Sequence, residues 1–139
     1  MRYIIYILIT LWSQGLFSQT FNLSIAITEI RSTDGEIVIG LYNNKESFPL
    51  VDKQYKEITT EVKSFSGIYI IKDLPKGEYA VAIFHDENSD MICNTNFFGI
   101  PKEGYGFSNN FRPKLSKPDF SDCKIVINAD TLINIKLIY

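Results

Sequence analysis

The sequence has few of the side chains that most often carry metal or nucleophile chemistry. Its 139 residues include one His and two Cys, which leaves little material for a transition-metal site or a catalytic triad. Basic residues are not in excess, because 14 Lys and Arg stand against 16 Asp and Glu. Without a basic surface the chain has no general means of holding a phosphate backbone, so we predict no nucleic-acid partner.

Long apolar runs are also scarce. The run at residues 3–12 has ten residues, which is too short to span a bilayer. It follows the basic start Met1-Arg2 and ends in small or polar residues up to Ser18, and these three parts together are typical of a signal peptide. We therefore predict that residues 1–18 are a signal peptide, that the protein is exported to the periplasm or the extracellular space, and that no transmembrane segment remains after cleavage.

The remaining residues, 19–139, predict a single β-sandwich domain. Short segments of β-branched and aromatic residues alternate with turn residues along the chain, and no convincing amphipathic helix interrupts them. We expect an all-β fold, an antiparallel immunoglobulin-like or transthyretin-like sandwich of about seven strands with one long ordered loop. The strands are predicted at residues 21–28, 36–42, 58–63, 67–72, 78–84, 124–128 and 131–139.

Two features of this sandwich follow from local patterns. Asp34-Gly35 lies between the first two predicted strands, and Asp-Gly is a strong hairpin signal, so these strands are predicted to pair with each other. The segment 78–84 is apolar on both faces, which is typical of a strand in the centre of a sheet. We expect it to be the core strand.

The long segment 86–121 is the region in which we expect function, because long ordered loops in compact domains are usually functional. At its start, Asp86, Asn88 and Asp90 repeat the first, third and fifth ligand positions of a calcium loop, and Asn94 can add another oxygen. Calcium is therefore the one cofactor that the sequence suggests. The alternative is a metal-free turn, since Asp and Asn side chains also bond their own backbone.

A second part of this segment, residues 97–111, contains three Gly and five aromatic residues. Rigid aromatic side chains supply contact area at recognition surfaces. The residues predicted to contact a protein or glycan partner of the cell envelope are Glu103, Tyr105, Phe107 and Asn109. Alternatively, Phe97, Phe98 and Phe107 plug the open end of the sandwich. Exposed aromatic side chains would favour a binding surface, and buried ones would favour the plug.

The two cysteines, Cys93 and Cys123, are predicted to form a disulfide in an oxidising compartment. The alternative is a pair of separate thiols that pack as small apolar side chains. Neither cysteine has basic neighbours in sequence that would make it a nucleophile.

The single histidine, His85, lies where the core strand is predicted to end. A lone His in such a place is more often a hydrogen-bonded structural residue than a general base. No nucleophile and base are recognisable as a pair, so we predict no catalytic residues and no enzymatic activity. A hydrolase that uses His85 is the least favoured alternative.

Three motifs carry a resemblance to a known family: His85-Asp86-Glu87-Asn88, the block at residues 98–110, and Pro118-Asp119-Phe120. On these the chain resembles a bacterial family of exported proteins, domain of unknown function twenty-one forty-one (DUF2141). The resemblance implies a small exported β-sandwich with no assigned activity and no known ligand. Family members typically continue with Gly-Asn-Gly and Lys-Leu-Asp where this chain has residues 89–91 and 92–94.

Together these patterns predict a non-catalytic binding or accessory module of the cell envelope, with the long loop as its contact surface. The alternative from another class is a structural envelope-associated protein without a ligand, in which the loop only closes the sandwich.

Overall fold

The computed structural model describes residues 19–97, 99–114 and 116–139. The predicted signal peptide, residues 1–18, lies outside the described residues. The described part of the chain forms eight strands and two short helical turns, so it has one strand more than predicted. In chain order these are β1 Thr20–Thr28, β2 Glu36–Tyr42, β3 Lys56–Glu61, β4 Gly67–Pro75, β5 Gly77–Asp86, β6 Gly104–Phe107, the 3₁₀ turn η1 Ser108–Asn110, α1 Phe120–Cys123, β7 Ile125–Ile127 and β8 Thr131–Lys136.

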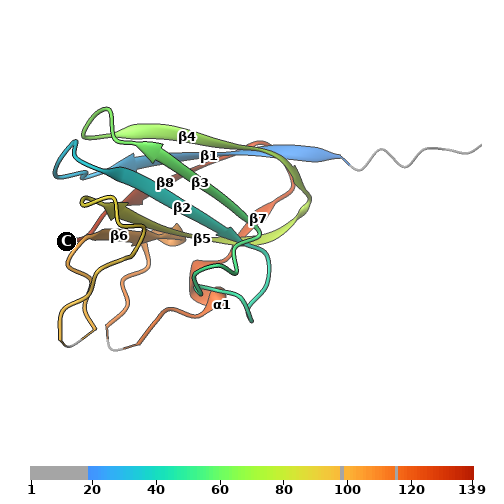
Figure 1. Cartoon of the computed structure of the whole chain (residues 1–139). Coiled ribbons are helices and arrows are strands. Elements are labelled where there is room, and N and C mark those ends of the chain that lie inside the picture. The colour runs from blue at the N-terminus through green and yellow to red at the C-terminus, as the bar shows by residue number, and fades with distance from the viewer. Residues whose placement is uncertain (1–18, 98, 115) are drawn as a thin grey trace, which may run out of the picture.

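The strands form two layered sheets, which confirms the all-β sandwich (Figure 1). One sheet has the order β4-β1-β8, and the other has the order β3-β2-β5-β6 with β7 also paired to β5. All strand pairs are antiparallel except β1 and β8, which run parallel. The additional strand, β6, lies inside the segment that was predicted to be a long loop.

The core lies between the two sheets and follows the period-two patterns of the sequence. Side chains at alternate positions point to the same face of a strand, and those of β1 and β2 that face each other are fully buried: Leu23, Ile25, Ile27, Ile37, Ile39 and Leu41. Burial of each such side chain is worth about 1.5–3 kcal/mol. This apolar contact holds the two sheets together.

The predicted core strand, β5, is indeed central. One edge of β5 pairs with β2, and the other pairs with β7 at residues 77–79 and with β6 at residues 82–85. The backbone N–H of Val81 falls between these two partners and donates to Ser108 Oγ at 2.9 Å. The same hydroxyl donates to the carbonyl oxygen of Cys123. Ser108 therefore fills the gap in the strand ladder and joins α1 to the sheet.

The predicted hairpin between β1 and β2 is wrong, because these strands belong to different sheets. The connection that contains Asp34 and Gly35 is held against the end of β5 instead. Gly35 has a φ of 71°, and a Cβ there would lie 1.9 Å from the carbonyl oxygen of Asp86. Only glycine fits so close to a neighbouring backbone. The Asp-Gly pair thus marks a crossing between sheets.

The predicted disulfide is also wrong, because Cys93 and Cys123 are both free. Cys123 packs in a cluster with Ala80, on the first half of β5. Cys93 follows the other end of β5 and lies near Asp86 and Glu103, whose charges act on its thiol. Ala80 and Asp86 are six positions apart, which is about 20 Å along a strand, so the fold keeps the two cysteines apart.

We expect Ser108→Ala to lower the free energy of unfolding by about 1–3 kcal/mol, because the Val81 N–H and the Cys123 carbonyl would both lose a buried partner. Urea unfolding followed by Tyr fluorescence measures this change. Ser121→Ala in the exposed part of α1 is the matched control and should change stability by less than about 0.5 kcal/mol. Equal effects of the two substitutions would show that Ser108 does not join the elements.

Candidate functional site

The end of β5 carries two adjacent polar side chains, His85 and Asp86, that are both fully buried. His85 Nε2 lies 2.8 Å from the carbonyl oxygen of Asp34, which can only accept, so Nε2 carries the proton. His85 Nδ1 lies 2.9 Å from Tyr139 Oη and accepts its proton when the ring is neutral. The hydroxyl of Tyr139 in turn accepts the N–H of Arg31 at 3.1 Å. A continuous hydrogen-bond chain therefore runs through His85.

This arrangement gives His85 a structural task. Its ring has no exposed surface, and both nitrogens are occupied by Asp34 and Tyr139. A general base needs access to the proton that it removes. The geometry therefore offers no support for a hydrolase that uses His85.

On the other face of the sheet, Asp86 accepts the backbone N–H of Asp90 at 3.2 Å and that of Met91 at 2.7 Å. Asp90 accepts the backbone N–H of Ile92 at 2.9 Å and the side-chain amides of Asn88 and Asn94, each at 2.9 Å. The four residues predicted to bind calcium are thus brought together at one turn.

The polar side chains of this turn bond one another and the backbone of the turn. Asn88 and Asn94 each donate a side-chain N–H to the Asp90 carboxylate, and the Asn88 side-chain oxygen accepts the Asp90 backbone N–H at 3.2 Å. The bond from Asn94 is the largest cause that lowers the pKa of Asp90 below its usual value. Desolvation opposes it, and the bonds from the Ile92 N–H and Asn88 add to the lowering. Among the described residues, no group of three or more His, Cys, Asp and Glu is arranged to hold a metal ion.

The turn contains two residues with positive φ, Ser89 at 57° and Met91 at 61°. Such a backbone favours glycine, and these are the two positions at which the family resemblance places glycine. The turn therefore has a backbone conformation that favours glycine at two positions where this chain carries side chains.

A second buried carboxylate, that of Glu103, closes the segment that leaves β5. Glu103 accepts the backbone N–H of Glu87 at 3.2 Å and that of Asn94 at 2.9 Å. Between Asn94 and Lys102 the chain forms a small hairpin, in which the N–H of Lys102 donates to the Asn94 carbonyl at 2.8 Å and Thr95 bridges to Pro101. The segment between β5 and β6 is therefore an ordered structure on a polar base.

The polar turn and this hairpin present four large apolar side chains to solvent, which we call the apolar tip: Met91 and Ile92 from the turn, and Phe97 and Ile100 from the hairpin. Their exposed fractions are 48%, 61%, 96% and 55%. Figure 1 shows the segment, in yellow to orange, projecting beyond the sheets. The sequence prediction of contact residues did not include this tip.

The four predicted contact residues have structural contacts instead. Glu103 is buried at the base of the hairpin. Phe107 packs edge to face against Phe48 at 6.1 Å between ring centroids and is half-buried, as is Tyr105, whose backbone pairs with Ile138. Asn109 donates to the carbonyl oxygen of Asp122, which lies in α1, and to that of Lys124, which follows α1. Of the predicted plug residues, Phe107 fits that role, Phe97 is exposed, and Phe98 lies outside the described residues.

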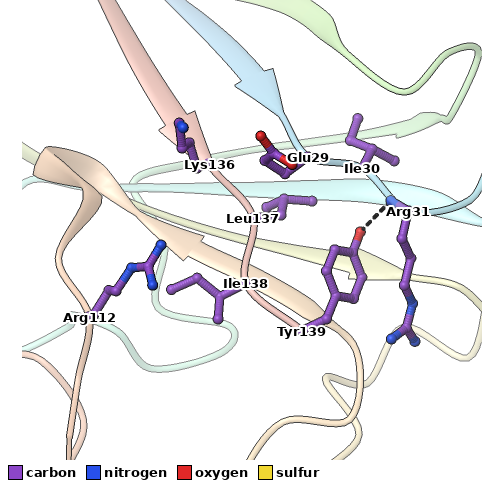
Figure 2. Close-up of a pocket in the computed structure, with 8 residues that line it drawn as sticks. All are labelled: Glu29, Ile30, Arg31, Arg112, Lys136, Leu137, Ile138 and Tyr139. Atoms are coloured by element: carbon purple, nitrogen blue, oxygen red, sulfur yellow. Dashed lines mark hydrogen bonds between the residues drawn. The ribbon is translucent and has the colours of Figure 1, made fainter.

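A groove beside the base of this hairpin is lined by the end of β1, the end of β8 and one residue that follows η1 (Figure 2). It has a volume of about 480 Å³. We call it the cationic groove, and its lining residues are Glu29, Ile30, Arg31, Arg112, Lys136, Leu137, Ile138 and Tyr139.

One wall of the cationic groove is held rigidly by Arg31. Its guanidinium donates to both carboxylate oxygens of Glu87, at 2.7 and 2.6 Å, and to the carbonyl oxygen of Lys102 at 3.4 Å. It also lies 4.3 Å from the centroid of the Tyr139 ring. The bond with Glu87 raises the pKa of Arg31, and the same bond lowers the pKa of Glu87. The two shifts agree that both groups are charged.

Comparison with known proteins gives one match. The model of an uncharacterised protein family conserved in bacteria, DUF2141, matches residues 25–134. The chain belongs to this family. The match spans both sheets of the DUF2141 fold and the whole hairpin with the apolar tip. No curated protein and no solved structure matches the chain. In the described part of this DUF2141 protein, no helix has the length and apolar character needed to cross a membrane.

We expect Glu87→Gln to lower stability by up to about 1 kcal/mol at neutral pH, since it removes one charge of a well-formed ion pair. Because the native pKa of Glu87 lies below its usual value of 4.5, the stabilisation is complete above that value and is lost as the pH falls through the native pKa. The difference between wild type and variant should therefore shrink as the pH falls below about 4.5. Urea unfolding across this range measures it.

Glu46→Gln is the matched control, because Glu46 forms a longer and more exposed pair with Lys45 at 3.8 Å. A Glu87→Gln deficit that stays constant with pH would contradict the ion-pair explanation.

Proposed function

We propose that this protein is a non-catalytic binding module of the bacterial cell envelope that docks onto an apolar surface of another envelope protein through its apolar tip. The observation that carries the proposal is the exposure of Met91 and Ile92 on the polar turn together with Phe97 and Ile100 on the hairpin that follows it. Single exposed apolar residues are common on protein surfaces, but several on one projecting element mark an interaction site.

The polar base of the hairpin supports this function. Asp86 and Glu103 accept four backbone N–H groups of residues in or next to the hairpin. A loop that is already ordered loses little conformational freedom on binding, so more of the contact energy appears as affinity. The buried carboxylates therefore prepare the tip for contact.

The chemistry of the tip favours a protein partner over a glycan. Aliphatic and thioether side chains offer no hydrogen bonds to sugar hydroxyls, whereas they pack well into apolar pockets on proteins. Each such side chain that becomes buried contributes about 1.5–3 kcal/mol before the cost of association.

The envelope location rests on the signal-peptide pattern of residues 1–18. The absence of catalysis is supported by the reactive side chains themselves. His85 is enclosed, and burial, followed by nearby acidic groups, raises the pKa of Cys93 to about 11 and that of Cys123 to about 12. Thiols with such values stay protonated at neutral pH and are poor nucleophiles.

A structural protein without a ligand is the alternative, and the packing of Phe107 against Phe48 fits it. That packing accounts for the half-buried block of β6. It does not account for the exposure of the side chains of the apolar tip.

The triple variant Ile92→Ser, Phe97→Ser and Ile100→Ser tests the docking proposal. Exposed residues contribute little to folding, so the unfolding midpoint should stay near that of the wild type. Retention of a partner from a detergent-solubilised envelope fraction should fall by about 100-fold or more, because residues at the centre of an interface cost more than 1 kcal/mol each. Quantitative pull-down of the tagged protein measures retention.

Two further arms make the outcome decisive. The control variant Ile70→Ser with Leu132→Ser changes exposed apolar residues on the outer face of the other sheet, and loss of retention there alone would move the interface to that face. Sedimentation with phospholipid vesicles that depends on the tip residues would assign a lipid surface in place of a protein.

We expect calcium to leave the thermal unfolding midpoint unchanged relative to a chelator, because the oxygens of Asp86 and Asp90 accept hydrogen bonds from the turn itself. A ligand at a hundredfold excess over its dissociation constant would add about 2.7 kcal/mol and raise the midpoint by several degrees. Differential scanning fluorimetry with millimolar calcium decides this. A calcium-dependent rise that Asp90→Asn abolishes would establish the ion site.

A further inference from the structure

We infer that the cationic groove is a binding site for a small anion, a carboxylate or phosphate group carried by a sugar or a similar polar molecule. Nothing in the docking proposal requires this site, and the apolar tip is not part of its lining. The groove has a volume of about 480 Å³, which lies within the usual range of about 300–1,000 Å³ for small-molecule sites.

The charge of the lining points to an anion. Three of the eight lining residues are cationic and one, Glu29, is acidic, although the whole chain has a net charge of −2. Arg31 is paired with Glu87, so the excess of positive charge in the groove comes from Arg112 and Lys136. Cations that share one concave surface raise the local concentration of anionic ligands.

Two of the cations are available to a ligand. Among the described residues, the side chains of Arg112 and Lys136 have neither an ion pair nor a hydrogen-bond partner, and both are exposed. Their chain segments are nevertheless fixed, because the Asn110 side chain accepts the Lys136 N–H at 2.8 Å and donates to the Asn134 carbonyl at 2.9 Å. The backbone is thus fixed beside each cation while the charged groups remain unpaired.

The opposite wall is preformed. Tyr139 is held by His85 and by the Arg31 N–H, as the dashed line in Figure 2 shows for the latter. Arg31 is neutralised by Glu87, so its task is to hold the ring in place. A ligand therefore meets a rigid aromatic wall on one side and two unpaired cations on the other.

The geometry also explains the choice of a small ligand over a nucleic acid. The groove offers two free cations, whereas a phosphate backbone needs a continuous series of them. One anionic group with a polar body matches this number. Arg112 can bind such a group with two parallel hydrogen bonds, and Lys136 adds a point charge.

Isothermal titration calorimetry of the purified protein tests the site with three probes: galacturonate, its neutral analogue galactose, and inorganic phosphate. We expect saturable binding of galacturonate with one site and no binding of galactose. Binding of phosphate at the same site would show that the anionic group alone is recognised. Binding of galacturonate without phosphate would assign a carboxylate on a sugar.

Substitutions place the binding in the groove. Arg112→Gln with Lys136→Gln should weaken binding by about tenfold or more, since charge-assisted hydrogen bonds are lost. Glu29→Gln should strengthen it by about two- to fivefold, because it removes the acidic side chain of the lining. Lys114→Gln with Lys117→Gln is the matched control, which removes two exposed cations outside the groove and should leave the dissociation constant unchanged.

Three outcomes would overturn the inference. They are the absence of saturable binding by both anions, equal binding of galactose and galacturonate, and equal effects of the groove and control variants. The triple variant of the apolar tip should bind the anion as the wild type does, so the two proposals can fail independently.

Discussion

The structure depends on the need to pair two buried polar side chains, His85 and Asp86, at the end of β5. Adjacent residues of a strand point to opposite faces, so one lies between the sheets and the other beneath the turn. Each would cost about 1–3 kcal/mol if its polar atoms were left without partners. Among the described residues, no buried side-chain nitrogen or oxygen lacks a hydrogen bond. The surrounding segments fold so that this condition is met.

Hydrogen bonds from these two side chains reach two different parts of the structure. From His85 it reaches Asp34, which holds the crossing between the sheets, and Tyr139, which forms a wall of the cationic groove. From Asp86 it reaches the turn that begins the hairpin, whose other end is held by Glu103. The groove and the apolar tip therefore rest on one buried polar centre, which explains how a domain with an otherwise apolar core can present two defined surfaces.

The parts of this architecture that sequence could predict are those with local signals. Period-two alternation located β1, the run after Asp34-Gly35 located β2, and a segment that is apolar on both faces located β5. The spacing of Asp86 and Asp90 located the polar turn. The Asp34-Gly35 hairpin failed because the deciding contact is with His85, 51 positions away. The groove wall could not be predicted for the same reason, since Arg31 bonds Glu87, which is 56 positions away in sequence, and Tyr139, which is 108 positions away. The apolar tip was missed because Ile92 and Ile100 resemble core residues until their exposure is known.

One side chain, that of Arg31, contacts both the base of the hairpin and the wall of the cationic groove. The Arg31 guanidinium bonds both Glu87, at the first residue of the hairpin segment, and the Lys102 carbonyl near its end. It therefore closes the base of the hairpin and, through the Tyr139 ring, forms the groove wall at the same time. Since the ligand-binding cations are on the opposite wall, an anion can bind without breaking the pair of Arg31 and Glu87. Occupation of the groove should thus leave the hairpin in place, and the two surfaces can be used together.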